Sequence, residues 1–393
     1  MAIAKYIETN LSRSSWIRKM FEEGAMLKSQ YGAERVYDFT IGNPNLEPPA
    51  EFRQALIEAV QNPEAGTHGY MSNAGYSFVR KAIAGYLSTE QGIPLTEQEV
   101  IMTCGAAGAL NVMLKTLLDP GDEVLCPRPY FVEYGFYADN HGGVLKTAPT
   151  NADFTLDLAA LADAITPKTK VVLINSPNNP TGQVYAQESL LALGDLLRER
   201  SKAYNRIIYL VSDEPYRKII YDGRTVPSIM TCYNESFIGH SYSKDLSVPG
   251  ERIGFLAVNS KISDKDKVLG GLVMSNRILG YVNAPALMQR VLVSLQGKSV
   301  DVSVYQKKRD LLCDGLADCG YAASKPAGAF YVFLKTPIAD DVAFVKALQD
   351  ELILTVPGSG FGGPGHIRIA YCVDDQTIIR ALPGFKRVFA KYK

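Results

Sequence analysis

The chain has 393 residues, 47% hydrophobic and 21% charged, which is typical of a globular protein long enough for two domains. Lysine plus arginine and aspartate plus glutamate both number 41, and the net charge of +0 argues against a nucleic-acid or acidic-membrane partner. The six cysteines form no CxxC pair, which predicts reduced cytoplasmic thiols rather than a zinc site, and neither a signal peptide nor a membrane segment of roughly 18 apolar residues is visible.

The N-terminal part predicts helices separated by glycine- and proline-rich loops. Apolar residues at helical spacing predict a helix over residues 14–30, and further helices are expected over 52–60 and 76–87. Gly42 opens an irregular loop in which the backbone could approach a ligand closely, although a plain inter-domain turn is an equal alternative. Tyr70 lies in a glycine-flanked loop, where it either packs or donates to an anion.

Small residues follow the first apolar strand of the central region. Gly105, Ala106 and Ala107 connect that strand to a helix, and backbone N–H groups at such a helix start bind phosphate. The pattern is not GxGxxG, so a dinucleotide site is disfavoured, and small residues also serve close packing. After the next strand, over 122–127, Phe131 could stack on a planar ring, although such aromatics are more often part of the core.

Polar side chains end the next two strands. The strand over 170–174 leads to Asn179, a neutral donor suited to a phenolate oxygen. Asp213 ends the following strand, where a carboxylate is costly without a partner such as a protonated pyridine nitrogen. Tyr216 is three residues further on and could reach the same ring.

The segment over 241–255 combines an amine with groups that bind anions. An arginine near Lys244 favours its neutral, nucleophilic form. Ser241, Ser243 and Arg252 are the groups that a bound phosphate needs. The simplest interpretation is an amine that attacks the aldehyde of pyridoxal phosphate. The alternative is a surface loop with ordinary charges.

Short strands alternating with helices predict a largely parallel sheet with helices on both faces, and the candidate residues lie at its carboxyl edge. The pattern then changes to a long helix over 284–316, a strand around Gly328, a helix over 342–351 and a closing helix over 375–391. Arg368 lies within an apolar strand, where either a substrate carboxylate or an internal salt bridge would satisfy it. We expect residues 1–42 to form an arm and part of a small domain, 43–283 a large domain, and 284–393 a small α+β domain.

In their order and spacing, these motifs resemble the class I/II aminotransferases, the fold-type I pyridoxal-phosphate enzymes, from the Gly42 loop to Arg368. The resemblance implies a mostly parallel, seven-stranded type of sheet. It implies that Lys244 holds the cofactor as a Schiff base and moves the substrate proton, and that Asp213 pairs with the pyridine nitrogen. Asn179 and Tyr216 would bind the phenolic oxygen, and Phe131, neither tryptophan nor tyrosine, would stack on the ring.

The resemblance also implies how phosphate and substrate are held. Arg368 would bind the α-carboxylate and Gly42 would lie over the substrate, while Arg277 loosely matches a second arginine used for dicarboxylic substrates. A surface arginine is the alternative for Arg277. Phosphate would be held by Gly105, Ala106, Ala107, Ser241, Ser243 and Arg252, with Tyr70 reaching in from the second subunit of a homodimer.

The implied activity moves an amino group from an L-amino acid to a 2-oxo acid by a ping-pong mechanism, with aspartate, glutamate or an aromatic amino acid as substrate. One alternative is a carbon–sulfur β-lyase of the cystathionine type, because such enzymes share the lysine, aspartate and arginine. Another is a cofactor-binding sensory module, which would require a DNA-binding domain for which the chain has no basic segment. A structural protein without cofactor is the third.

Overall fold

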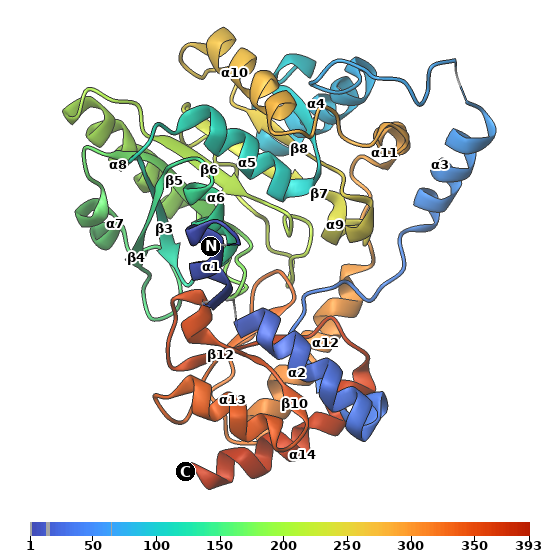
Figure 1. Cartoon of the computed structure of the whole chain (residues 1–393), viewed down its shortest axis with the longest axis vertical. Coiled ribbons are helices and arrows are strands. Elements are labelled where there is room, and N and C mark those ends of the chain that lie inside the picture. The colour runs from blue at the N-terminus through green and yellow to red at the C-terminus, as the bar shows by residue number, and fades with distance from the viewer. Residues whose placement is uncertain (1, 13–15, 64) are drawn as a thin grey trace.

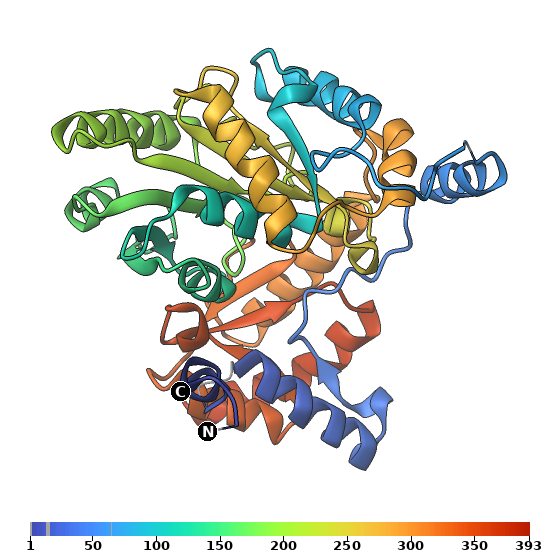
Figure 2. The same cartoon turned by 45° about the horizontal axis from the view of Figure 1, so that its top comes forward.

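The computed structural model describes residues 2–12, 16–63 and 65–393. In these residues a large sheet with its helices occupies the upper half of Figure 1, and a smaller group of helices and strands lies below it. The C-terminus belongs to the lower group (Figure 1 and Figure 2). No described helix combines the length and the apolar character needed to span a bilayer.

The large sheet has seven strands in the order β2-β8-β7-β6-β5-β3-β4. Neighbours pair in parallel from β4 to β7, whereas β8 runs antiparallel to both β7 and β2. The mostly parallel sheet predicted from the sequence is therefore confirmed. The strands are β2 Val100–Thr103, β3 Glu123–Arg128, β4 Val144–Pro149, β5 Thr169–Asn175, β6 Tyr209–Asp213, β7 Ser236–Ser241 and β8 Gly254–Val258.

Helices cover both faces of this sheet, as predicted. Alternate residues of β5 belong to two separate apolar clusters, with Val172 and Ile174 in one and Val171 and Leu173 in the other. Strands buried on both faces read as continuous apolar runs, which explains their sequences. The first cluster includes α3 Ala50–Gln61, α4 Ser77–Gln91, α7 Leu158–Ala164, α8 Gln187–Ala203 and α11 Ala286–Val291, and the second includes α5 Gly105–Leu117, α6 Glu133–Asp139 and α10 Lys265–Ile278.

The smaller group is built on a three-stranded sheet in the order β11-β12-β9 and a β1–β10 pair. Its core is a third apolar cluster that includes Phe39, Phe330 and Phe385. The strand that carries Arg368 and the closing helix are both present as predicted. The elements are β1 Tyr37–Asp38, β9 Tyr331–Lys335, β10 Ile353–Leu354, β11 Val356–Pro357, β12 His366–Ala370, α1 Lys5–Ser12, α2 Trp16–Tyr31, α12 Val302–Asp318, α13 Asp341–Gln349 and α14 Asp375–Lys391.

The helices predicted over 284–316 and 14–30 differ from the helices in the structure. The continuous helix predicted over 284–316 is wrong, because the chain breaks between α11 and α12. Gly297 adopts a positive φ of 80°, and Asp301 then caps α12 by accepting a hydrogen bond from the Ser303 backbone N–H. The helix predicted over 14–30 corresponds to α2, but its expected first residue, Ser14, lies outside the described residues. The domain boundaries after residues 42 and 283 stay predictions.

Candidate functional site

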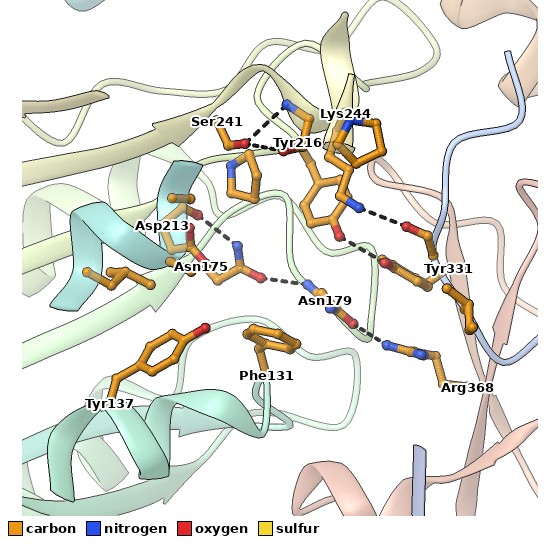
Figure 3. Close-up of a pocket in the computed structure, with 18 of the residues that line it drawn as sticks. Phe131, Tyr137, Asn175, Asn179, Asp213, Tyr216, Ser241, Lys244, Tyr331 and Arg368 are labelled. Atoms are coloured by element: carbon orange, nitrogen blue, oxygen red, sulfur yellow. Dashed lines mark hydrogen bonds between the residues drawn. The ribbon is translucent and has the colours of Figure 1, made fainter. Parts of the chain in front are cut away.

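A cavity of about 380 Å³ opens at the carboxyl ends of β5, β6 and β7, where β9 and β12 of the smaller group approach the large sheet (Figure 3). Parallel sheets bind ligands at this edge. Most residues singled out from the sequence line the cavity: Gly42, Ala106, Ala107, Phe131, Asn179, Asp213, Tyr216, Ser241, Ser243, Lys244, Arg252 and Arg368.

Lys244 points its amine into the cavity from α9, Tyr242–Asp245. Its Nζ donates a hydrogen bond to the carbonyl oxygen of Gly42 at 2.8 Å. Burial, with smaller contributions from the nearby Arg368 and Arg252, lowers the pKa of Lys244 to about 8, and Cys372 opposes this shift. The arginine effect predicted from the sequence is present but smaller than that of burial. An amine with this pKa is partly neutral at physiological pH and can act as a nucleophile.

The glycine at position 42 allows this approach of backbone to amine. A side chain there would overlap the hydroxyl of Tyr331, which lies on β9 of the smaller group. The loop therefore does more than turn the chain between domains: it brings a carbonyl oxygen to the amine of Lys244.

Asp213 lies at the end of β6 with an unmatched oxygen. Its Oδ2 accepts a hydrogen bond from the Tyr134 hydroxyl at 2.6 Å, while the buried Oδ1 has no partner among the described residues. Burial raises the pKa of Asp213 to about 7, and the hydrogen bond from Tyr134 opposes that rise. A buried carboxylate oxygen without a donor is costly, so this position calls for a cationic N–H group from a ligand.

The start of α5 lies at the cavity, where Ala106 and Ala107 line it. Gly105 has a φ of +72°, and a Cβ at this position would lie only 2.9 Å from Nη2 of Arg252. The first-turn backbone N–H groups of α5, a thirteen-residue helix, carry the positive end of the helix dipole. The hydroxyls of Ser241 and Ser243 lie beside each other, 2.5 Å apart. Together with the guanidinium of Arg252, these groups form a cradle suited to a phosphate.

Arg368 is buried with only 3% of its surface exposed. Its Nη1 donates to Oδ1 of Asn179 at 3.0 Å and its Nη2 to the carbonyl oxygen of Thr40 at 2.6 Å, while Nε has no partner among the described residues. No described carboxylate pairs with it, so the alternative of an internal salt bridge is wrong within the described chain. Burial lowers the pKa of this arginine. An anionic ligand would compensate the buried charge.

Aromatic side chains form the remaining walls. Figure 3 shows Phe131 across the cavity from Lys244. The Tyr216 and Tyr331 hydroxyls are hydrogen-bonded at 2.8 Å, and the Tyr331 ring lies 4.7 Å from the guanidinium carbon of Arg368. A flat ligand between Phe131 and the opposite wall would therefore meet an aromatic face.

Three of the residues predicted from the sequence do not line this cavity: Gly105, Tyr70 and Arg277. Tyr70 is 94% exposed and does not line it. Arg277 is an exposed residue near the end of α10 and does not line it either. Within one chain, neither side chain contributes to the cavity.

Some cavity residues escaped the sequence analysis. Asn175, the last residue of β5, donates to the backbone oxygen of Asp213 at 2.7 Å and accepts from the backbone N–H of Asn179 at 2.6 Å. Its position at a strand end was the available signal. Tyr331, which lines the cavity, and Tyr134, which contacts Asp213 without lining it, gave no signal, because each lies among aromatic residues that are typical of a core.

The comparisons with known proteins agree with this geometry. A family model described as "Aminotransferase class I and II" matches residues 34–384. The chain belongs to this family. A probable aspartate aminotransferase from Methanocaldococcus jannaschii is 33% identical over 89% of this chain and 92% of its own length. An aspartate/prephenate aminotransferase from Thermus thermophilus is 32% identical over 90% of both chains.

Solved structures give the same family. An amino transferase from Eubacterium rectale superposes with a TM-score of 0.97 at 39% identity and covers 100% of both chains. The aspartate aminotransferase from Thermus thermophilus with maleate superposes with a TM-score of 0.87 at 28% identity, over 99% of this chain and 100% of its own. The fold is thus that of the aspartate-aminotransferase-like fold-type I proteins, and this protein is an aminotransferase of a family that depends on pyridoxal phosphate. These comparisons give no support to the carbon–sulfur lyase.

The residues present fit this cofactor by their own chemistry. The unpartnered Oδ1 of Asp213 suits a protonated pyridine nitrogen, and the amine of Lys244 suits an aldehyde. The helix start with Arg252 suits a phosphate. One elongated, flat, phosphorylated aldehyde would satisfy all three positions.

Proposed function

We propose that this enzyme binds pyridoxal 5'-phosphate through Lys244 and transfers an amino group from an L-amino acid to a 2-oxo acid in two half-reactions, a ping-pong mechanism. The observation that carries the proposal is that one cavity contains both the Lys244 amine and the buried Asp213 oxygen that has no partner. The Asp213 oxygen has no partner among the described residues, and no described carboxylate pairs with the Lys244 amine, whose hydrogen bond goes to the Gly42 carbonyl oxygen. Both are explained by a single cofactor.

The proposed roles follow from where each group lies. Asp213 would hold the pyridine nitrogen in its protonated form, and Phe131 would stack on the ring. Tyr216 and the amide nitrogen of Asn179 would donate to the phenolic oxygen, because Oδ1 of Asn179 already accepts from Arg368. The phosphate would be held by Gly105, Ala106, Ala107, Ser241, Ser243 and Arg252.

When bound, pyridoxal phosphate draws electrons from an attached amino acid and so makes its α-proton removable. Arg368 would bind the α-carboxylate with two parallel N–H donors and so orient the α-carbon. The amine of Lys244, made partly neutral by burial, would take the proton from that carbon and return it on the cofactor side. Gly42 would cover the substrate, with its carbonyl oxygen accepting from Lys244.

The substrate side chain has two candidate classes. The cationic residues that line the cavity are Lys244, Arg252 and Arg368, and each already has a proposed task. An uncharged, for example aromatic, side chain therefore needs nothing further from this chain. An aspartate or glutamate side chain needs another cation, which Arg277 of a second subunit would supply. Similar proteins are named for both classes, aspartate/prephenate and aromatic-amino-acid aminotransferases.

A homodimer with shared sites would explain the position of Tyr70. Its ring is 94% exposed, and Ile57, Val60 and Phe78 from the same region also expose apolar surface. We infer that Tyr70 reaches the phosphate of the other subunit. Mixing a Tyr70→Ala variant with a Lys244→Ala variant should restore activity, since a hybrid dimer contains one site with both native residues. Mixtures that stay inactive would rule out shared sites.

The direct test of the proposed function is spectral. Purified enzyme loaded with pyridoxal phosphate should change its visible absorption when a donor amino acid is added without acceptor, and a 2-oxo acid should reverse the change. Aspartate, glutamate, phenylalanine and leucine would be compared as donors, and the keto-acid product measured. Release of pyruvate, ammonia and a thiol from cystathionine without amino transfer would contradict the proposal.

A further inference from the structure

Among the described residues, Tyr134 is the side chain that donates a hydrogen bond to the Asp213 carboxylate. Its hydroxyl donates to Oδ2 at 2.6 Å, and the neighbouring amide of Asn175 donates to the backbone oxygen of Asp213 instead. The Tyr134 side chain is fully buried, with 0% exposed. Burial and the nearby Asp213 carboxylate raise the pKa of Tyr134, so the phenol keeps its proton and acts only as a donor.

The same ring supports Phe131. The two rings pack edge to face with centroids 5.6 Å apart and planes at 85°, and the backbone N–H of Tyr134 donates to the carbonyl oxygen of Phe131 at 3.1 Å. Phe131 and Asp213 come from different parts of the chain, and both line the cavity. Tyr134, in the first turn of α6, contacts both.

We propose that Tyr134 is a positioning residue for the cofactor ring. Its hydroxyl fixes one oxygen of the Asp213 carboxylate so that the other oxygen faces the cavity. Its ring packs against Phe131 and so holds Phe131 in place to stack on the cofactor ring. This inference rests on the proposed function, in which Asp213 faces the pyridine nitrogen. Tyr134 thus holds both Asp213 and Phe131 in position before the cofactor binds.

The charges around Asp213 make the hydroxyl important. Burial and the following residue, Glu214, favour the protonated carboxyl, whereas the hydrogen bond from Tyr134 and the imidazole of His240 favour the ionised form. Without the hydroxyl, the carboxyl would need a higher pH to ionise and would hold a pyridinium less strongly. The other described titratable groups that interact with the carboxylate are Cys126 on β3, Tyr137 on α6 and Tyr216.

The test compares Tyr134→Phe with Tyr233→Phe. Tyr233 is also buried, and its hydroxyl donates at 2.8 Å to the backbone oxygen of Ile208, beside the opposite end of β6. Tyr134→Phe loses one buried hydroxyl bond, whereas Tyr233→Phe loses two, the second with the Ser201 hydroxyl at 3.3 Å. Only the Tyr134 bond reaches Asp213. The readout is the dissociation constant of pyridoxal phosphate as a function of pH, measured by absorbance and equilibrium dialysis.

Tyr134→Phe should weaken cofactor binding about 10-fold to 100-fold, the usual worth of a hydrogen bond to an ionised group. The acidic limb of its binding curve should also move to higher pH, whereas Tyr233→Phe should leave that limb in place. In an Asp213→Ala background, Tyr134→Phe should have little further effect, because the coupled partner is gone. Equal curves for both variants, or full additivity in the double variant, would overturn the inference.

The outcomes separate this inference from the proposed function. Wild-type enzyme that binds no pyridoxal phosphate would reject the proposed function itself. If the Tyr134→Phe variant fails to fold, the coupling between Tyr134 and Asp213 can be measured in the cofactor-free wild-type protein instead. Ionisation of Asp213 near pH 7 should perturb the ultraviolet absorption of Tyr134 in wild type but not in Asp213→Ala. Identical difference spectra for the two proteins would contradict the coupling.

Discussion

Replacing Asp213 with asparagine should stabilise the cofactor-free protein while it impairs the enzyme. The carboxyl is buried with its pKa raised from 3.8 to about 7, so the folded state binds the proton more tightly than the unfolded chain. Its contribution to stability is present at low pH and is lost as the pH rises from about 4 to about 7. Each tenfold change in an ionisation constant corresponds to about 1.4 kcal/mol, so the buried charge costs about 4 kcal/mol above pH 7.

Asparagine fits the same space, carries no charge and can still accept the hydrogen bond from Tyr134. The free energy of unfolding of apo wild type and apo Asp213→Asn would be measured by urea denaturation between pH 4 and pH 8. The difference between the two proteins should grow from under about 1 kcal/mol at pH 4 to about 4 kcal/mol at pH 8.

The control is Asp163→Asn, which removes an exposed carboxylate on α7 and should follow the wild-type profile. Parallel profiles for wild type and Asp213→Asn would refute the reasoning, because they would mean that the carboxylate carries no burial penalty. Increased apo stability together with lost transamination would identify Asp213 as a group kept for function at a cost in stability.

Other predictions concern the amine and the substrate. The rate of pyridoxal phosphate capture by apo enzyme should rise with pH through a midpoint near 8, because the lowered pKa of Lys244 leaves the nucleophilic form above it; a flat stopped-flow profile would contradict this. Arg368→Ala should lower kcat/KM about 100-fold to 10,000-fold by removing two charged hydrogen bonds to the α-carboxylate, with Arg368→Lys in between; unchanged kinetics would remove its substrate role. Arg277→Ala should weaken aspartate or glutamate at least about 10-fold more than phenylalanine if it binds a side-chain carboxylate, and equal losses would exclude that role.

Much of the site could be predicted because its residues end strands. Asn179, Asp213 and Lys244 follow consecutive apolar runs, and parallel strands bring their carboxyl ends to one edge. A polar group after a buried strand is conspicuous in sequence. The same reasoning identified Arg368, since a cation inside an apolar strand requires an anion.

The rest depends on contacts that one sequence does not encode locally. Tyr134 and Tyr331 are aromatic residues among other aromatics, and only the fold shows that their hydroxyls face Asp213 and Tyr216. The antiparallel strand β8 was not predicted, because it directly follows the binding segment in an otherwise parallel pattern. The predicted long helix failed for a local reason, the positive φ at Gly297.

The covalent link between Lys244 and the cofactor is the proposed feature on which all the other roles depend. Enzyme loaded with pyridoxal phosphate would be reduced with borohydride, digested and analysed by mass spectrometry. We expect one stable pyridoxyl-phosphate adduct, on the peptide that contains Lys244, and none in Lys244→Ala. An unmodified Lys244, or an adduct confined to other lysines, would contradict this expectation.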